Sequence, residues 1–380
     1  LETAGGTAVG TLLQSRPAPD PHSFLGEGKV EELRQAVEAT GANMVIFDND
    51  LSPSQIRTLE DITGATVIDR SALILDIFAQ RAKTREGRLQ VELAQYQYLL
   101  PRLSGMGRSL SRQGGGIGTR GPGETRLESD RRHIRTRISR LQQELKEVRR
   151  VRGVQRQLRE KNSVPVVALI GYTNAGKSTL LNALTGAGIP ANNRLFDTLD
   201  TTTRRMTVSD TLDVLLSDTV GFIAKLPHNL VEAFQATLEE LQYADLLLHV
   251  IDASDPDRTA HMEVVEKLAA QLAPQGVPII EVYNKADLVE PQLIPVGENK
   301  VAISAATGTG LPRLLELVEQ NLDTGVRRVT MKLPYSSAGE VDRIHREGKV
   351  FTTEYENDGI LVEAALSREM QGRYRDYILS

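Results

Sequence analysis

The fold of this chain is decided by the stretch Gly171-Tyr-Thr-Asn-Ala-Gly-Lys-Ser178. It follows an apolar run from Val164 to Ile170 and precedes a helical pattern from Thr179 to Leu184. A short apolar run of this kind is typical of a strand buried on both faces of a parallel sheet. Strand, G-x-x-x-x-G-K-S loop and helix in this order predict a P-loop, whose backbone N–H groups and helix N-terminus bind phosphates.

Each residue type in the loop has an expected role. Lys177 should bridge the β- and γ-phosphates, and the Ser178 hydroxyl should bind Mg²⁺. The carbonyl oxygen of Asn174 could help to hold a monovalent cation, so K⁺ is a second candidate cofactor. The predicted phosphate-binding residues are Gly171, Tyr172, Thr173, Asn174, Ala175, Gly176, Lys177, Ser178 and Thr179.

The base is indicated by Asn284-Lys-Ala-Asp287, which follows an apolar strand from Pro278 to Tyr283. A carboxylate at Asp287 can accept hydrogen bonds from both N1–H and the N2 amine of guanine. Adenine offers no such pair of donors, and each buried hydrogen bond left unmade costs roughly 1–3 kcal/mol. GTP is therefore favoured over ATP. The predicted guanine-binding residues are Asn284, Lys285, Ala286 and Asp287, with Ser304, Ala305 and Ala306 after the last strand of the domain.

Two further segments have the order expected of nucleotide-sensing switches. The predicted second switch is Asp218, Thr219, Val220 and Gly221, at the end of a strand from Leu212 to Ser217. The predicted first switch, rich in hydroxyls, contains Phe196, Asp197, Thr198, Leu199 and Asp200. One of its threonines should complete the Mg²⁺ shell, and spacing alone does not select which. Phe222 follows Gly221 and cannot orient water by hydrogen bonding, so we expect slow hydrolysis without a partner.

The first half of the chain has a different pattern. Apolar runs at Ala8–Leu13, 43–47 and 66–68 alternate with helical patterns at 29–40 and 54–62, which predicts a small βαβαβ unit. Two amphipathic helices, 84–103 and about 124–161, should form an antiparallel hairpin. The expected domains are an α/β subdomain at 1–83, the hairpin at 84–162, a G domain at 163–325 and a small α+β appendage at 326–380.

The hairpin is basic, although the whole chain carries a net charge of −5. Residues 101–162 contain 17 Lys or Arg against 6 Asp or Glu. Such a segment indicates either a solvated helix face or a nucleic-acid surface. Six glycines lie within residues 113–124, between the helices, and can bring backbone close to phosphates. The predicted RNA-contact residues at this tip are Gly114, Gly115, Gly116, Gly118, Arg120, Gly121, Pro122, Gly123, Glu124 and Arg126.

Composition limits the class of protein. A chain of 380 residues with 40% hydrophobic and 25% charged residues is globular and has room for two or three domains. No apolar run approaches the roughly 18 residues of a membrane span, and there is no cysteine, which fits a reducing compartment. We expect a cytoplasmic monomer without stable membrane insertion. Because the sequence starts with leucine, we interpret it as beginning after the natural start.

Four segments together resemble the HflX family of translational GTPases. They are GGGIGTRGPGETRLESDRR (114–132), GYTNAGKS (171–178), LFDTLDTTTRR (195–205) and DTVGFIAKLPH (218–228). By this similarity the Mg²⁺-binding switch threonine is Thr198. The family usually has Pro where this chain has Thr201 and Gln where it has Arg126; neither change removes a ligand, although the second alters the tip contacts.

The resemblance implies a fold and a function. The fold class is α/β: a P-loop G domain with a mostly parallel six-stranded sheet and helices on both faces, preceded by the α/β unit and the long antiparallel hairpin and followed by the α+β appendage. The implied protein binds GTP, GDP and the large ribosomal subunit with its RNA, not DNA, and dissociates stalled or idle ribosomes in its GTP state. It would be a GTP phosphohydrolase, slow alone and stimulated by ribosomes.

Two other functions stay open. The first is a GTP-dependent RNA- or ribosome-binding switch with negligible turnover, acting in ribosome assembly or anti-association. The second is a small-molecule kinase, which also uses a P-loop; Asn284 and Asp287 argue against it.

Overall fold

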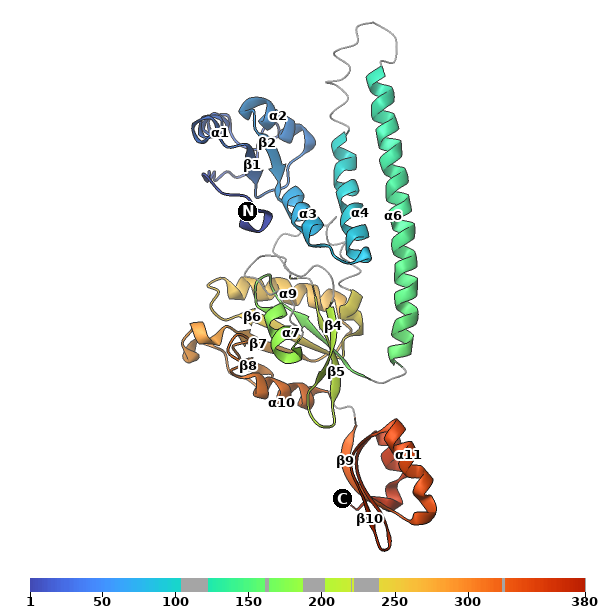
Figure 1. Cartoon of the computed structure of the whole chain (residues 1–380). Coiled ribbons are helices and arrows are strands. Elements are labelled where there is room, and N and C mark those ends of the chain that lie inside the picture. Colours follow the sequence, from blue (N-terminus) through green and yellow to red (C-terminus); the bar gives the residue numbers. More distant parts are fainter. Residues whose placement is uncertain are drawn as a thin grey trace. The chain divides into compact units, whose positions relative to one another are not determined.

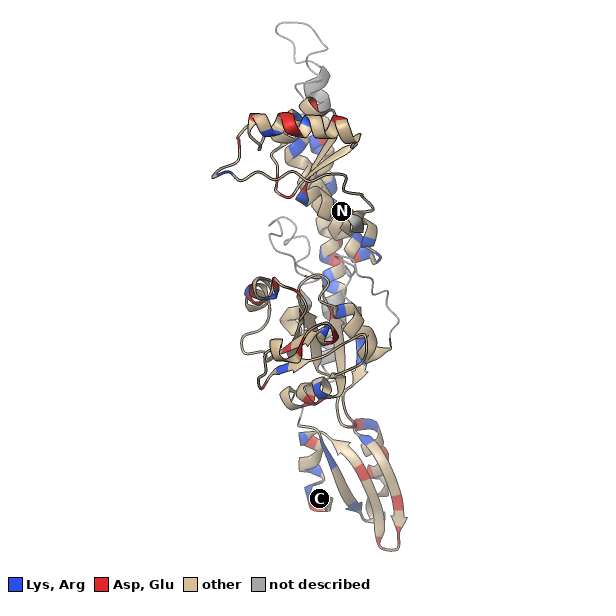
Figure 2. Ribbon diagram, turned by 90° about the vertical axis from the view of Figure 1, so that its left-hand side faces the viewer, with Lys and Arg blue, Asp and Glu red and all other residues tan. Residues whose placement is uncertain are grey.

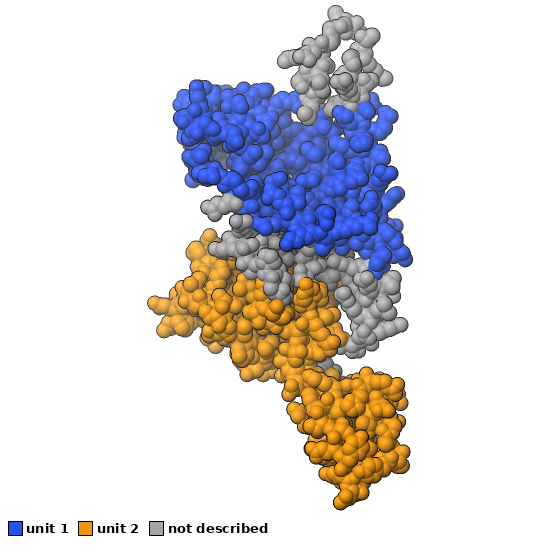
Figure 3. Space-filling model, viewed as in Figure 1, with its two compact units in different colours: residues 1–158, 192–200, 223–238 blue, residues 159–191, 201–222, 239–380 orange. Residues whose placement is uncertain are grey.

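The structure, a computed structural model, describes residues 1–103, 122–160, 164–186, 202–219, 221, 239–322 and 325–379. These residues fall into two compact units (Figure 3). The first unit runs from Leu1 to Leu158, and the second contains the described residues from Arg159 onward. No helix that the structure describes is both long and apolar enough to span a bilayer.

A two-stranded parallel sheet surrounded by helices forms the N-terminal part of the first unit (Figure 1). Its core includes Leu33 from the first helix, Leu59 from the second and Val67 from the sheet. A capping box between Ser52 and Gln55 starts the second helix, as their sequence spacing favours. Its elements are η1 (Glu2–Ala4), α1 (Glu27–Thr40), β1 (Met44–Phe47), α2 (Pro53–Thr63), β2 (Thr66–Asp69) and α3 (Arg70–Arg81).

The prediction of a strand at Ala8–Leu13 is wrong, because this segment pairs with no other strand among the described residues. Leu12 packs against the neighbouring core, whereas the side chain of Leu13 is 85% exposed. An apolar run resembles a strand in sequence, but a strand forms only where another strand pairs with its backbone N–H and C=O groups. The helix α3 was not anticipated by the sequence pattern.

The hairpin consists of α4 (Arg85–Arg102) and α6 (Pro122–Glu160), which lie side by side and antiparallel (Figure 1). Leu89 and Leu93 of α4 pack against Leu141 and Leu145 of α6 in a small core of their own. The apolar residues of α6 recur at helical spacing, so one face meets α4. Arg137 also forms an ion pair with Glu92 across the two helices, with 2.6 Å between Nη2 and Oε1.

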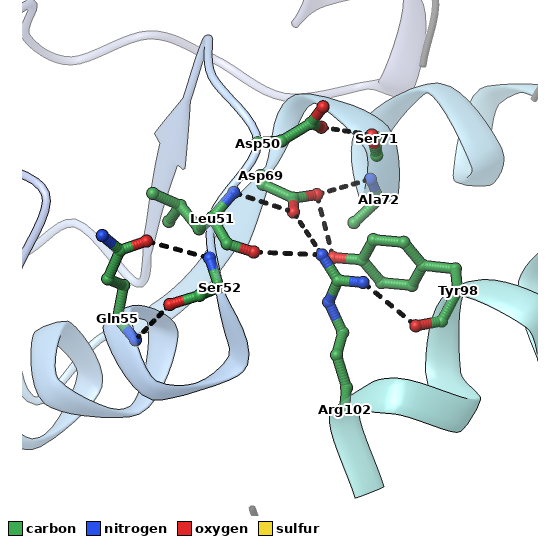
Figure 4. Close-up of polar contacts among 9 residues, drawn as sticks. All are labelled: Asp50, Leu51, Ser52, Gln55, Asp69, Ser71, Ala72, Tyr98 and Arg102. Carbon is green, nitrogen blue, oxygen red and sulfur yellow. Dashed lines mark hydrogen bonds and ion pairs between the residues drawn. The ribbon is translucent and has the colours of Figure 1, made fainter. Parts of the chain in front are cut away.

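One buried carboxylate joins α4 to the N-terminal sheet (Figure 4). Asp69, at the end of β2, is 0% exposed. It accepts hydrogen bonds from Tyr98 Oη at 2.8 Å, from Arg102 Nη2 at 2.7 Å and from the backbone N–H groups of Leu51 and Ala72. A buried charge needs such partners because desolvation is costly. The network therefore fixes α4 against the carboxyl ends of this sheet.

The second unit is built on a six-stranded sheet with the order β4-β5-β3-β6-β7-β8. All neighbours are parallel except β4 and β5, which are antiparallel, so the predicted mostly parallel sheet is confirmed. The strands are β3 (Val166–Ile170), β4 (Thr202–Thr207), β5 (Asp213–Asp218), β6 (Leu246–Asp252), β7 (Ile279–Asn284) and β8 (Lys300–Ala302). The helices are α7 (Lys177–Thr185), α9 (Arg258–Leu272) and α10 (Leu311–Asn321), with the short turns η3 (Glu239–Tyr243), η4 (Ala286–Leu288) and η5 (Pro291–Leu293).

Helices cover both faces of this sheet, as predicted. Alternate residues of the central strands point to opposite faces. On one face Leu169, Val250 and Val282 pack against α7 and α10. On the other, Ile251 and Tyr283 pack against Met262 of α9. This double cover explains the nearly continuous apolar sequence of β3 and β6.

The C-terminal elements form a three-stranded antiparallel sheet, order β10-β11-β9, with helices against one face. Met331, Ile344, Val362 and Met370 belong to its separate core. Both signs of charge are spread over these elements (Figure 2). They are β9 (Arg327–Leu333), η6 (Tyr335–Ser337), α11 (Ala338–Glu347), β10 (Lys349–Glu356), β11 (Gly359–Leu366), α12 (Arg368–Arg373) and η7 (Arg375–Tyr377). This arrangement agrees with the α+β appendage expected from the sequence.

Candidate nucleotide-binding site

The glycine-rich loop between β3 and α7 has a backbone conformation that requires glycine at two positions. Gly171 has φ +156°, and a Cβ placed on it would lie 2.3 Å from the carbonyl oxygen of Val250. Gly176 has φ +94°, and a Cβ there would lie 2.2 Å from Asn284 Nδ2. Both positions therefore exclude any side chain. The loop passes close to β6 and β7 and ends at the N-terminus of α7, where backbone N–H groups favour an anion.

Lys177, the first residue of α7, is buried beside this loop. Its Nζ donates hydrogen bonds to the carbonyl oxygens of Gly171 at 3.1 Å and Tyr172 at 2.9 Å. Burial lowers the pKa of Lys177 to about 8, and the nearby charge of Asp218 opposes this shift. A buried ammonium held by two neutral carbonyls is suited to bind a phosphate, which would supply a further counter-charge beside that of Asp218.

Next to Lys177, a hydroxyl and a carboxylate meet across two elements. Ser178 Oγ donates a hydrogen bond of 2.9 Å to Asp218 Oδ2, at the end of β5. Hard cations such as Mg²⁺ prefer oxygen ligands of this kind, so the pair fits the predicted metal position. Thr219 is held separately, because its hydroxyl donates to the carbonyl oxygen of Leu169 at 2.6 Å.

Gly221 and Thr173 complete the phosphate side. A Cβ on Gly221 would lie 3.0 Å from Thr173 Cγ2 and 3.1 Å from Lys177 Nζ, so the second switch closely approaches the loop. The hydroxyl oxygen of Thr173 is buried and has no hydrogen-bond partner within the described parts of the chain. Because an unsatisfied buried hydroxyl costs free energy, a ligand that supplies its partner is favoured here.

The segments predicted to bind guanine adjoin the phosphate loop. Asn284, at the end of β7, donates from Nδ2 to the carbonyl oxygen of Ala175 at 2.9 Å. Its Oδ1 accepts from the backbone N–H of Ala305 at 3.0 Å. One buried side chain thus joins the P-loop, the 284–287 turn and the 304–306 segment. Asp287, the middle residue of η4, is exposed, so its carboxylate is accessible to a ligand.

Other predicted residues can be placed only in part. Ser304 and Ala305 are buried, whereas Ala306 is exposed. The predicted first switch (Phe196–Asp200, including the metal ligand Thr198), Val220 and Phe222 lie outside the described residues. So do Gly114, Gly115, Gly116, Gly118, Arg120 and Gly121 of the predicted RNA tip. Pro122, Gly123, Glu124 and Arg126 fall in the first two turns of α6.

Sequence reasoning missed two contributors to the site, both near the carboxyl end of β6. Asp252 forms an ion pair of 2.6 Å with Lys285, the second residue of the predicted guanine-binding turn. His261 of α9 stacks on Tyr172 of the P-loop, with ring centroids 3.6 Å apart. Asp252 could have been noticed, since polar residues that follow a buried parallel strand often lie at the ligand edge of the sheet. No local sequence signal marks His261.

Family models match most of the chain. A model described as "GTP-binding GTPase N-terminal" matches residues 1–79, and one described as "GTP-binding GTPase Middle Region" matches residues 81–159. A third, described as "50S ribosome-binding GTPase", matches residues 166–285.

Curated relatives match along almost the whole length. The GTPase HflX of Caldanaerobacter subterraneus subsp. tengcongensis is 50% identical over 379 residues, covering 100% of this chain and 88% of the relative. The GTPase HflX of Escherichia coli is 49% identical over 340 residues, covering 88% and 80%. Among solved structures, a GTP-binding protein from Sulfolobus solfataricus in complex with GDP is 24% identical, with a TM-score of 0.45, over 84% of this chain and 92% of that one.

Proposed function

The chain belongs to the HflX family of GTPases, and from this premise we propose that it binds the large ribosomal subunit and, in its GTP state, dissociates stalled or idle ribosomes. The description "50S ribosome-binding GTPase" of the matching G-domain model supports this partner. The proposed place of action is the cytoplasm, where the ribosomes are.

The observation that carries the ribosome proposal is the polarity of α6. Its apolar face packs on α4, and its other face exposes arginines and a lysine over the part whose side chains are described. Neutralising phosphates with such side chains releases counterions, which drives binding to nucleic acid. The exposed basic residues are Arg132, Arg135, Arg140, Lys146, Arg149 and Arg150.

On the nucleotide side, we assign the phosphates to residues 171–179 and the base to Asp287 with residues 304–306. Lys177 binds the terminal phosphates and Asn284 keeps the two halves of the site together. Ser178 would hold Mg²⁺ directly and Asp218 through water. Bound there, the metal would neutralise charge on the phosphate oxygens. Thr198 of the first switch is proposed as the second protein ligand.

We propose that hydrolysis is slow in the free protein and is stimulated by ribosomes. Phe222 stands where a water-orienting side chain would be needed, so another group must order the attacking water. Asn174 is exposed in the loop with φ +64° and is a candidate ligand of K⁺ beside the phosphates. GTPase rates that are equal in potassium and sodium buffers would remove K⁺ from the mechanism.

Sedimentation of joined ribosomes tests the main proposal. Excess protein with a non-hydrolysable GTP analogue should convert 70S particles into subunits, whereas protein with GDP should not. A charge-reversal variant, Arg132→Glu with Arg140→Glu, should lose this effect and keep its GDP affinity, because both residues lie on α6. Unchanged 70S particles with wild-type protein and the GTP analogue would contradict the proposal.

Asp287→Asn tests how the base is recognised. The amide oxygen can still accept from guanine N1–H, but the amide NH2 then faces the N2 amine, donor against donor, so GTP binding should weaken by at least about tenfold. Xanthine carries a carbonyl where guanine carries the N2 amine, and binding of xanthosine triphosphate should improve. Titration of both nucleotides measures the change, and equal GTP affinity in wild type and variant would show that Asp287 does not contact the base.

The alternative is a GTP-dependent ribosome-binding switch with negligible turnover, which Phe222 favours. Measuring phosphate release with and without ribosomes separates the two functions. A rate that stays near zero under both conditions supports the switch.

A further inference from the structure

A side-chain contact outside the predicted nucleotide ligands supports the P-loop from α9. The rings of Tyr172 and His261 are stacked, with centroids 3.6 Å apart and an interplanar angle of 13°. His261 Nδ1 lies 2.6 Å from Asp255 Oδ2. Tyr172 is the second residue of the P-loop, and the other two residues come from the loop after β6 and from α9.

The stack of Tyr172 on His261 is linked to Lys177 through the backbone carbonyl of Tyr172. The backbone carbonyl of Tyr172 accepts a hydrogen bond of 2.9 Å from Lys177 Nζ and one of 3.3 Å from the N–H of Ala175. A contact that holds Tyr172 in place therefore also helps to position the ammonium group of Lys177. Gly171, just before it, is confined by its close approach to the carbonyl oxygen of Val250.

Asp255 is itself held firmly, so it can orient the imidazole. Its Oδ1 accepts from the N–H of Asp257 at 2.9 Å, and its carbonyl oxygen accepts from the N–H of Arg258 at 3.2 Å. Asp252, the last residue of β6, pairs with Lys285 at 2.6 Å. The segment from Asp252 to His261 thus contacts the P-loop through His261 and the predicted guanine-binding turn through Asp252.

We propose that Tyr172, His261 and Asp255 form a brace that holds the P-loop in its nucleotide-binding shape, with His261 as a positioning residue. The inference rests on the proposed GTP site, because the brace acts through Lys177. An aromatic stack contributes only modestly to free energy, yet its loss would release the carbonyl that places the lysine.

Calorimetric titration of the full chain with GDP and with a non-hydrolysable GTP analogue tests the brace. His261→Ala should weaken both by about three- to tenfold, the range expected for one stacked pair. His261→Phe keeps a ring for stacking without the bond to Asp255, so it should recover most of the affinity. Tyr172→Ala should match His261→Ala, and the double variant should be no weaker than either single variant.

Two controls make the outcome specific. His345→Ala changes an exposed histidine of α11 and should leave nucleotide affinity unchanged. Thermal unfolding identifies any variant that fails to fold. If His261→Ala does not fold, His261→Phe is tested in its place. If wild type binds GDP and a folded His261→Ala variant binds it equally well, the brace is overturned while the proposed function stands. If wild type binds no guanine nucleotide, the proposed function fails and the brace fails with it.

Discussion

At the scale of single residues, two buried polar side chains organise the nucleotide site. Asn284 connects the P-loop with the segment at Ala305, so its amide is a structural bridge between the two segments. Lys177 is buried against two carbonyl oxygens and a short distance from the second switch. Each is a polar group whose burial is tolerated because it is hydrogen-bonded.

The lysine leads to a pH prediction. With a pKa of about 8 in the free protein, Lys177 is largely neutral at pH 8.5 and charged at pH 6.5. Phosphate favours the charged form, so GDP binding should raise this pKa and take up more than half a proton at pH 8.5 and almost none at pH 6.5. Calorimetry in two buffers of different ionisation enthalpy measures the uptake. Equal uptake at both pH values would exclude this role of Lys177.

At the scale of elements, strand β6 contacts both halves of the candidate site. It lies between β3 and β7, supplies the carbonyl that confines Gly171 and ends in Asp252, the partner of Lys285. It also carries His249, which is 2% exposed and opposite Glu281 in the register with β7. Burial lowers the pKa of His249 to about 4, with Glu281 opposing the shift.

His249 should make the G domain sensitive to acid. The His249 imidazole takes up a proton near pH 6.5 in the unfolded chain but only near pH 4 in the folded chain. The free energy of unfolding should therefore fall as the pH drops from about 6.5 to about 4. The full effect is roughly 3 kcal/mol at 1.36 kcal/mol per pKa unit. Between pH 7 and pH 5 the urea concentration at the midpoint of unfolding should fall less for His249→Gln than for the wild type. Identical pH dependence in both proteins would mean that His249 is not the group responsible.

The Asp69 network gives a prediction for the contact between α4 and β2. Arg102→Ala removes the cation that faces a fully buried carboxylate, and because the arginine is partly exposed we expect a loss of about 2 kcal/mol. Arg88→Ala on the same helix is a control, since Arg88 is exposed and donates a hydrogen bond to the nearby Lys83 carbonyl; this variant should change stability by less than about 0.5 kcal/mol. Hydrogen exchange of the β2 and α3 amides reports the local opening. Equal exchange in both variants would contradict the role of this network.

At the scale of the whole molecule, the described residues form several separate hydrophobic cores. The residues around Leu59, the α4–α6 contact, the six-stranded sheet and the C-terminal sheet each have their own cluster. A domain with its own core can keep its structure when another is removed.

Truncation tests this independence. A chain that ends at residue 325 lacks β9 to β11 but keeps the core of the six-stranded sheet. Its affinity for GDP should stay within about twofold of that of the full chain, because the contacts described at the candidate site all come from residues before 325. A tenfold loss would show that the C-terminal elements support nucleotide binding.

Local signals in the sequence predicted the P-loop, from an apolar run and a glycine spacing, and the helical hairpin, from a helical repeat of leucines. The six-stranded sheet was expected from the resemblance to a known family. The same local reasoning failed at Ala8–Leu13, where an apolar run has no partner strand, and did not find α3.

Which distant residues meet became visible only in the folded structure. Asn284 reaches Ala175 across 109 residues of sequence, His261 stacks on Tyr172 and Arg102 pairs with Asp69. Such contacts depend on strand order and on helix packing, and no spacing along the chain encodes them. A hydrogen bond or a stack is formed by atoms that are close in space, so its identity becomes visible only when the sheet has brought its strands together.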